Sequence, residues 1–240
     1  MNLPRLPIPG LFITATDTGV GKTIIAGAIA RSLKSAGRRV AVLKPVATGC
    51  ASVREGLVSE DAEFLAAASD THHPLDLICP NRYQEALAPS VAARRAKQPL
   101  DWEAVARSIR IMSADSDAMI IEGVGGVLAP LDDKTSVRDM IVALGTPAVI
   151  AARAGLGTIN HTLLTIEALR SAGVPIAGVV INRYPTDSVG IAEESAPREI
   201  ERIAKAPILA IVPEERIHLP TIPAGIMSAI AQVDWEALLG

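Results

Sequence analysis

The chain has 240 residues, of which 49% are hydrophobic and 2% aromatic, and its formal net charge is −3. This length accommodates one large α/β domain, and we expect residues 1–240 to form a single domain. The near-neutral charge, without basic runs, argues against nucleic-acid partners and against binding to an anionic membrane surface. Because no apolar run reaches the ~18 residues of a membrane span, we expect a soluble, cytoplasmic protein.

The first predicted strand, at about residues 11–15, runs into the segment ATDTGVGKT at residues 15–23, and a helix follows. Loop amides and a helix N-terminus together favour a bound anion. We expect Lys22 to reach the β- and γ-phosphates of a nucleotide and the Thr23 hydroxyl to bind Mg²⁺. The P-loop pattern has glycine five residues before Gly21, where this chain has Thr16. A helix-capping turn that binds nothing is therefore the alternative.

The rest of the chain alternates between strand and helix patterns. Predicted strands lie at 39–44, 118–121, 148–152, 177–181 and 208–212, and predicted helices at about 60–68, 101–112, 136–144, 159–169 and 198–205. Residues 47–100 are otherwise irregular, and the segment after residue 215 is left unassigned. This alternation predicts an α/β fold of the P-loop NTPase type, with a mostly parallel sheet and helices on both faces.

Polar residues follow several of the predicted strands, and ligands bind at the carboxyl ends of such strands. Glu122 follows four apolar residues, so it is expected to be buried and therefore paired or bound to metal. With Thr23 beside a phosphate, Mg²⁺ is favoured over a salt bridge to a lysine. A second carboxylate is left open by the residues alone, with Asp61 favoured. The other aspartates that compete for this role are Asp132, Asp133 and Asp139. The other polar residues at strand ends are Lys44, Asn182 and the segment 213–215.

Lys44 is either a solvated lysine or a residue that faces the phosphates. Together, Lys22, Lys44 and Mg²⁺ would neutralise the charge on a transferring phosphoryl group. The chain contains no Gly-x-Ser-x-Gly nucleophile elbow. The residues therefore predict a Mg-nucleotide enzyme of the P-loop class and leave the second substrate open.

Other potential metal ligands are sparse in the sequence. Cys50 and Cys79 are too few for a disulfide framework, and no cysteine–histidine cluster has zinc-site spacing. His72 and His73 precede a proline in a polar stretch, where a solvated loop is favoured over a metal site.

Four segments resemble the dethiobiotin synthetase family in order and spacing. They read TDTGVGKT at 16–23, KPVATG at 44–49, EGVGG at 122–126 and GTINH at 157–161. The similarity extends from about Phe12 to Pro213, and the family's loop also departs from the usual glycine at the position of Thr16. The resemblance implies a carbon–nitrogen-forming cyclo-ligase of biotin biosynthesis.

The family closes a cyclic urea on 7,8-diaminononanoate with CO₂, which bicarbonate supplies, and MgATP. One amine becomes a carbamate, whose oxygen attacks the γ-phosphate. The neighbouring amine then attacks the mixed carbamic–phosphoric anhydride and releases phosphate. The resemblance also implies a homodimer with sites at the interface.

The resemblance implies roles for individual residues. It assigns catalysis to Lys22 and Lys44 and Mg²⁺ binding to Thr23, Asp61 and Glu122, which favours Asp61 over the other aspartates. The implied ATP contacts are Gly19, Val20, Gly21, Lys22, Thr23, Ile24, Asp61, Glu122, Gly123, Val124, Gly125, Asn182, Arg183, Pro213, Glu214 and Glu215. The implied substrate contacts are Thr18 and Thr48, with Gly157, Thr158, Ile159 and Asn160 contributed across the dimer interface.

Other classes remain as alternatives. A ParA/MinD-like ATPase switch would have a signature lysine where this chain has Asp17. An amide ligase related to cobyrinate amidation would need an appended glutaminase domain. A non-catalytic homologue is disfavoured because both lysines and both acids of the predicted site are present. Glu194 stands near a position where some family members have tyrosine, which leaves the contacts to the substrate tail open.

Overall fold

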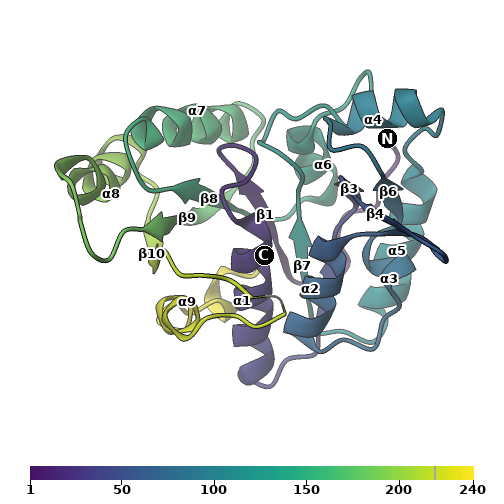
Figure 1. Cartoon of the computed structure of the whole chain (residues 1–240), viewed down its shortest axis with the longest axis horizontal. Coiled ribbons are helices and arrows are strands. Elements are labelled where there is room, and N and C mark those ends of the chain that lie inside the picture. Colours follow the sequence, from purple (N-terminus) through teal and green to yellow (C-terminus); the bar gives the residue numbers. More distant parts are fainter. Residues whose placement is uncertain (219) are drawn as a thin grey trace.

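The computed structural model describes residues 1–218 and 220–240. Its centre is a six-stranded sheet in the order β10-β9-β8-β1-β7-β2, and every pairing within it is parallel (Figure 1). Most of its strands are apolar runs buried on both faces, as expected of a parallel sheet covered by helices. The strands are β1 (Gly10–Ala15), β2 (Val40–Leu43), β7 (Ala118–Glu122), β8 (Ala148–Arg153), β9 (Ile176–Tyr184) and β10 (Ile208–Pro213).

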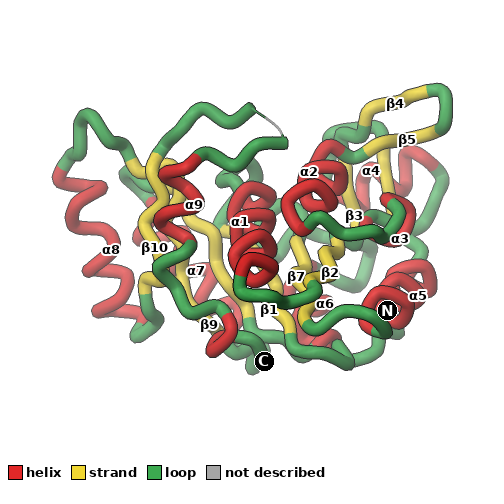
Figure 2. The backbone as a smooth tube through the Cα atoms, turned by 90° about the horizontal axis from the view of Figure 1, so that it is seen from below, coloured by secondary structure: helices red, strands yellow, loops and turns green. Residues whose placement is uncertain are grey.

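Helices cover both faces of this sheet (Figures 1 and 2). One face carries α1 (Lys22–Ser35), α2 (Glu60–Ser69) and α9 (Ala224–Ile230), of which α1 packs against the other two. The opposite face carries α5 (Trp102–Ser113), α6 (Val137–Leu144), α7 (Thr158–Arg170) and α8 (Ile191–Ala204). The predicted α/β fold with helices on both faces is confirmed.

The connections that leave β1 and β7 cross the parallel sheet in opposite directions. From β1 the chain passes through α1 to β2 at one edge, whereas from β7 it passes through α6 to β8 on the other side. The carboxyl ends of β1 and β7 therefore form a topological switch point, where ligands of open α/β sheets bind. The phosphate loop follows β1, and Glu122 ends β7.

The segment 47–100 contains elements that the sequence analysis did not assign. They are β3 (Val46–Thr48), paired in parallel with β6 (Asn81–Tyr83), the hairpin of β4 (Ala51–Val53) and β5 (Gly56–Val58), α3 (Leu75–Ile78) and α4 (Pro89–Ala96). These elements are too short to show a clear apolar period, so no sequence pattern predicts them. The segment after residue 215 adds α9 and the short 3₁₀ helix η1 (Glu236–Leu238).

Two predicted boundaries differ from the structure by more than one residue. Helix α8 begins at Ile191 instead of residue 198, because the Glu193 carboxylate accepts a hydrogen bond from the Gly190 N–H and starts the helix before Pro197. Strand β9 continues to Tyr184, so Asn182 lies within the strand and not after it. No helix in the described ranges is both long and apolar enough to cross a membrane.

Candidate active site

The phosphate loop lies between β1 and α1 and is held in place by β9. Asn182 Nδ2 donates a hydrogen bond of 2.8 Å to the Val20 carbonyl. Gly21 has φ of 93°, and a Cβ there would lie 2.1 Å from Asn182 Nδ2, so only glycine fits. Gly21 offers α1 no side-chain cap, which leaves the first N–H groups of the helix available to an anion.

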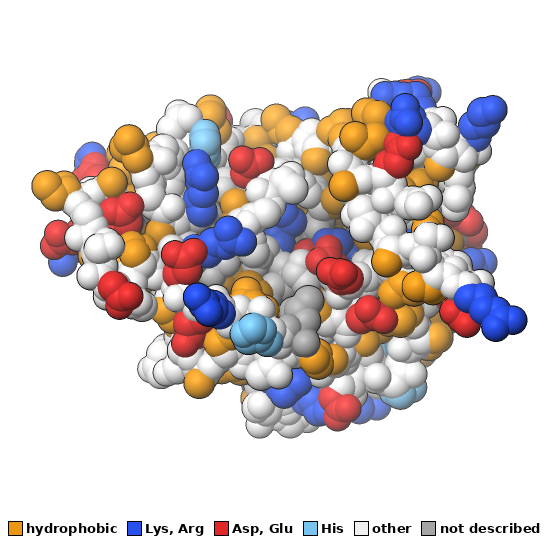
Figure 3. Space-filling model, viewed as in Figure 1, with side chains coloured by type: hydrophobic (Ala, Val, Ile, Leu, Met, Phe, Trp, Pro, Cys, Tyr) orange, Lys and Arg blue, Asp and Glu red, His pale blue; other side chains and the backbone are white. Residues whose placement is uncertain are grey.

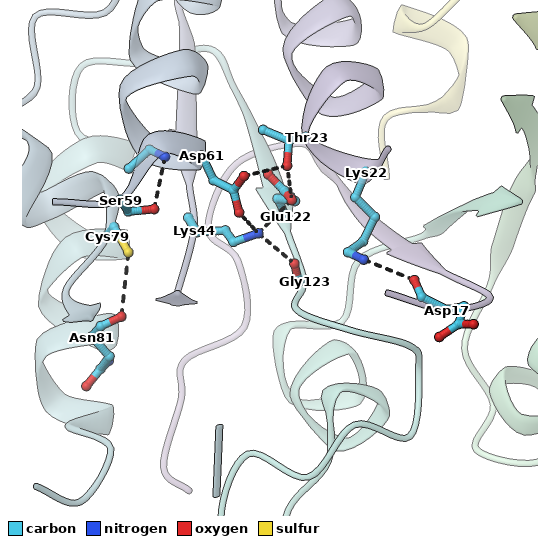
Figure 4. A network of polar contacts seen from close by, with 11 residues as sticks. Asp17, Lys22, Thr23, Lys44, Ser59, Asp61, Cys79, Asn81, Glu122 and Gly123 are labelled. Atoms are coloured by element: carbon cyan, nitrogen blue, oxygen red, sulfur yellow. Dashed lines mark hydrogen bonds and ion pairs between the residues drawn. The ribbon is translucent and has the colours of Figure 1, made fainter. Parts of the chain in front are cut away.

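Thr23, in the first turn of α1, meets two carboxylates. Its Oγ1 lies 2.9 Å from Asp61 Oδ1 and 2.8 Å from Glu122 Oε1 (Figure 4). The single hydroxyl proton can serve only one of them at a time. Glu122 Oε2 is buried and has no hydrogen-bond partner within the described residues. The three side chains thus form an oxygen-rich cluster with spare acceptor capacity.

Helix α2 carries Asp61 to this cluster. The Ser59 side chain caps the helix by accepting a hydrogen bond from the Ala62 N–H, which places Asp61 in the first turn. The other candidate aspartates have different roles. Asp132 accepts a hydrogen bond from the Trp102 indole, Asp133 pairs with Arg94, and Asp139 caps α6.

Lys44, just after β2, is buried between the two carboxylates. Its Nζ lies 2.6 Å from Glu122 Oε1, 2.8 Å from Asp61 Oδ2 and 3.1 Å from the Gly123 carbonyl oxygen (Figure 4). Burial by itself would lower the pKa of Lys44, but the two carboxylates outweigh it and raise that pKa, so the ammonium stays charged. Of the two alternatives for Lys44, the solvated surface lysine is excluded.

The pKa values of the two carboxyl groups are shifted in opposite directions. Burial raises the pKa of Glu122, although Lys44 opposes this effect. Asp61 is less enclosed, and there the attraction of Lys44 outweighs burial and lowers the pKa. Burial therefore disfavours the charged form of Glu122 more than that of Asp61, and a cation beside Glu122 stabilises its charged form.

Lys22 is a second buried cation, and it points away from the carboxylates. Its Nζ donates to the Asp17 carbonyl at 3.4 Å (Figure 4), and burial lowers its pKa to about 8, with Lys44 contributing and Glu122 opposing. Among the described residues, this desolvated ammonium has a single acceptor, the distant Asp17 carbonyl, and it is therefore suited to a phosphate group.

Two adjoining cavities, which share Gly21 and Arg183, hollow out this part of the surface (Figure 3). The first, of about 280 Å³, is lined by Thr18, Gly19, Gly21, Lys22, Thr23, Lys44, Thr48, Asp61, Glu122, Val124, Gly125 and Arg183. The second, of about 340 Å³, is lined by Gly21, Asn182, Arg183, Pro213, Glu214, Glu215, Ile217 and Ile226. Most of the site residues expected from the sequence thus line one continuous cleft.

Some expected residues do not face this cleft with their side chains. The side chains of Val20 and Ile24 are buried, so only their backbone groups are available to a nucleotide. Gly123 offers its carbonyl to Lys44. The Glu215 carboxylate lines the second cavity but accepts a hydrogen bond of 3.0 Å from the Ile226 N–H at the start of α9. Residues 157–160 lie in neither cavity, at the beginning of α7.

Ile217 and Ile226 were missed as cleft residues. Both lie in the segment that the sequence analysis left unassigned. The spacing of Ile226 and Ile230, one helical turn apart, indicates the buried face of a helix. Both side chains are buried in the structure. The packing of α9 against β10 places Ile226 beside Asn182 and Pro213.

Comparisons with known proteins show the family to which the chain belongs. A family model described as an AAA domain matches residues 9–218. The ATP-dependent dethiobiotin synthetase BioD of Anaeromyxobacter dehalogenans strain 2CP-C is 42% identical over 207 residues, which are 86% of this chain and 90% of the relative. That of Thermodesulfovibrio yellowstonii is 37% identical over 211 residues, covering 85% of this chain and 88% of the relative.

The chain belongs to the dethiobiotin synthetase family. The family expected from the sequence, and with it the class of ATP-dependent ligases, is confirmed. Solved structures that share the fold include a ParA family ATPase from Chlorobium tepidum, at TM-score 0.57 and 16% identity over 97% of this chain and 98% of that one. MinD from Pyrococcus horikoshii, solved with Mg-ADP, has TM-score 0.57 and 17% identity over 95% and 96% of the two chains. At these identities the likeness concerns the fold alone.

Proposed function

We propose that the protein closes the cyclic urea of dethiobiotin from 7,8-diaminononanoate, CO₂ and ATP. The observation that carries this proposal is Lys44, a buried ammonium held by two carboxylates beside a phosphate loop in a chain of this family. Because the reaction passes through a carbamate and a mixed carbamic–phosphoric anhydride, it needs positive charge at the transferring group and no protein nucleophile. The cleft provides that charge.

The triphosphate occupies the first cavity and the adenine the second. The free N–H groups at the start of α1 and the Lys22 ammonium face the β- and γ-phosphates. Lys44 lines the same cavity, where it stabilises the carbamate oxygen and the γ-phosphoryl group during transfer. Asn182 and the segment 213–215 border the base.

Thr23, Asp61 and Glu122 fit a magnesium ion. They offer a hydroxyl and two carboxylates, which are hard oxygen donors, and Glu122 Oε2 is buried without a partner among the described residues. When bound, Mg²⁺ supplies charge neutralisation on the phosphate oxygens. The chain's own contribution is to hold these three side chains together from α1, α2 and β7.

The diamine enters beside Thr18 and Thr48, which line the phosphate cavity. Its carboxylate is received by residues 157–160 of a second subunit, at the N-terminus of α7. Large apolar side chains are exposed just before α7, within it and at the start of α8: Leu156 by 88%, Leu164 by 61% and Ile191 by 85%. Such an apolar surface beside the proposed carboxylate site supports a homodimer.

The test is to incubate the purified protein with 7,8-diaminononanoate, bicarbonate and MgATP and to measure cyclic urea and ADP. We expect the two products in equal amounts, and no ADP above background without the diamine. ATP hydrolysis that is indifferent to the diamine would refute the ligase and favour an ATPase switch.

A pair of variants connects the activity to the site. Lys44→Ala is expected to lose turnover while it keeps most of its affinity for MgATP, because Lys22 and the loop amides remain. Lys134→Met, which alters an exposed lysine, is the matched control and should keep full activity. A collapse of nucleotide affinity in Lys44→Ala would make Lys44 a ground-state phosphate ligand instead.

A further inference from the structure

Three potential metal ligands gather outside the nucleotide cleft: His72, His73 and Asp115. The histidines follow α2, and Asp115 follows α5, 43 positions from His72. His72 Nε2 lies 3.0 Å from Asp115 Oδ2, and His73 Nε2 lies 3.2 Å from Asp115 Oδ1. The predicted solvated loop was wrong for His73, whose side chain is 5% exposed and covered by its neighbours.

We propose that these three side chains form a binding site for a divalent transition metal ion, represented by Zn²⁺. One nitrogen from each histidine and an oxygen of Asp115 lie within 4.8 Å of one another. Zn–N and Zn–O bonds of about 2.0–2.1 Å separate tetrahedral ligands by roughly 3.3 Å. The two contacts between the histidines and Asp115, of 3.0 and 3.2 Å, are already near that separation.

The donor types select the ion. Two imidazole nitrogens and one carboxylate suit Zn²⁺, Co²⁺, Ni²⁺ or Cu²⁺, whereas Mg²⁺ prefers a set of oxygen ligands. The cluster therefore differs in donor chemistry from the oxygen-rich cluster of Thr23, Asp61 and Glu122, which excess Mg²⁺ can fill while a transition metal ion binds at the histidines.

The residues around the three side chains leave space for an ion and leave the negative charge of Asp115 available to it. The three side chains border a cavity of about 180 Å³, and His72 and Asp115 are 77% and 43% exposed, which provides an entry path and space for a water ligand. The Lys and Arg side chains of this cavity are each neutralised by a carboxylate other than Asp115. These pairs are Lys34–Asp70, Arg38–Glu236 and Arg39–Asp117.

The bound ion would join two helices that the sequence keeps far apart. His72 and His73 lie just beyond the C-terminal end of α2, and Asp115 just beyond that of α5. Asp61 of the nucleotide cleft is in the first turn of the same α2, so the proposed site is at the other end of that helix. We therefore assign the ion a structural role, in which it fixes α2 against α5, and not a role in the chemistry of the cleft.

The test is a titration of the full-length protein with Co²⁺ and Zn²⁺ in excess Mg²⁺, which occupies the cleft. We expect one Co²⁺ per chain with the visible absorption of nitrogen-ligated Co²⁺, displaced by Zn²⁺. At a hundredfold excess of Zn²⁺ over its dissociation constant, the melting temperature should rise by roughly 5–10 °C.

Variants decide whether these residues are the ligands. His73→Ala and Asp115→Asn should weaken binding at least tenfold, because even outer-shell changes commonly cost 10–100-fold. His72→Ala, at a largely exposed side chain, gives the same test without risk to the fold. Glu63→Gln is the control, since it removes one negative charge from an exposed side chain of the same helix α2, outside this cavity, and should leave binding unchanged. Absence of Co²⁺ binding, or affinity within twofold of the parent in His72→Ala and Asp115→Asn, would overturn the proposal.

Discussion

Replacing Lys44 with methionine tests the buried charge cluster directly. The change removes the ammonium that lies 2.6 Å from Glu122 and 2.8 Å from Asp61, and Glu122 is only 1% exposed. Removing one partner of a buried ion pair costs about 3–5 kcal/mol. Because the Asp61 side chain is 42% exposed, water can solvate it, and we expect the lower end, about 3 kcal/mol, at neutral pH.

The cost should depend on pH in a defined direction. Burial holds the pKa of Glu122 above its ordinary value of 4.5, and loss of Lys44 raises it further. The folded variant then binds a proton more tightly than the unfolded chain does. The contribution of Glu122 to the free energy of unfolding is therefore largest below pH 4.5 and falls as the pH rises through the folded pKa. In the parent, Lys44 lowers the pKa of Asp61, so stability is lost as the pH falls through that value. Both effects make the difference in the free energy of unfolding between parent and variant smaller in acid.

The assay is urea unfolding of both proteins at neutral pH and near pH 4.5, with the linear dependence on denaturant extrapolated to water. The double variant Lys44→Met/Glu122→Gln is the control, because it removes the unpaired charge and should recover a large part of the lost stability. A loss that is equal at both pH values, together with additive effects in the double variant, would refute the buried ion pair as the cause.

Three further changes test the loop and the sheet edge. Gly21→Ala puts a Cβ 2.1 Å from Asn182 Nδ2 at a φ of 93°, so the dissociation constant for a fluorescent ATP analogue should rise at least tenfold; an unchanged constant would contradict the clash. Asn182→Ala removes the hydrogen bond to the Val20 carbonyl, which is worth about 1 kcal/mol. The KM for ATP should therefore rise roughly fivefold, and a KM equal to that of the parent would count against this hydrogen bond as an anchor of the loop. Arg39 hydrogen bonds hold the pKa of Asp117 at about 2, below its ordinary value of 3.8. That carboxylate therefore adds stability that is present above pH 3.8 and lost as the pH falls through about 2. The melting temperature of Asp117→Asn should be lower than that of the parent at neutral pH and equal to it near pH 2; a constant gap would exclude this linkage.

The strands, the main helices and part of the site were predictable because they depend on near neighbours in the chain. An apolar run followed by GVGKT marks a strand, a turn and a helix, whatever the rest of the chain does. Lys44 follows β2, and Glu122 is the last residue of β7. Because parallel strands end at one edge of a sheet, these positions predicted that the two side chains lie close together.

Tertiary structure decided what depends on residues far apart in the sequence. Four aspartates were open as the second carboxylate, and packing of α2 against α1 brings Asp61 to Thr23 across 38 positions. The same applies to Ile226, which α9 carries to the cleft, and to Asp115, which meets His72 across 43 positions. Periodicity reports which face of an element is buried, but not which distant element covers it, so these contacts required the folded chain.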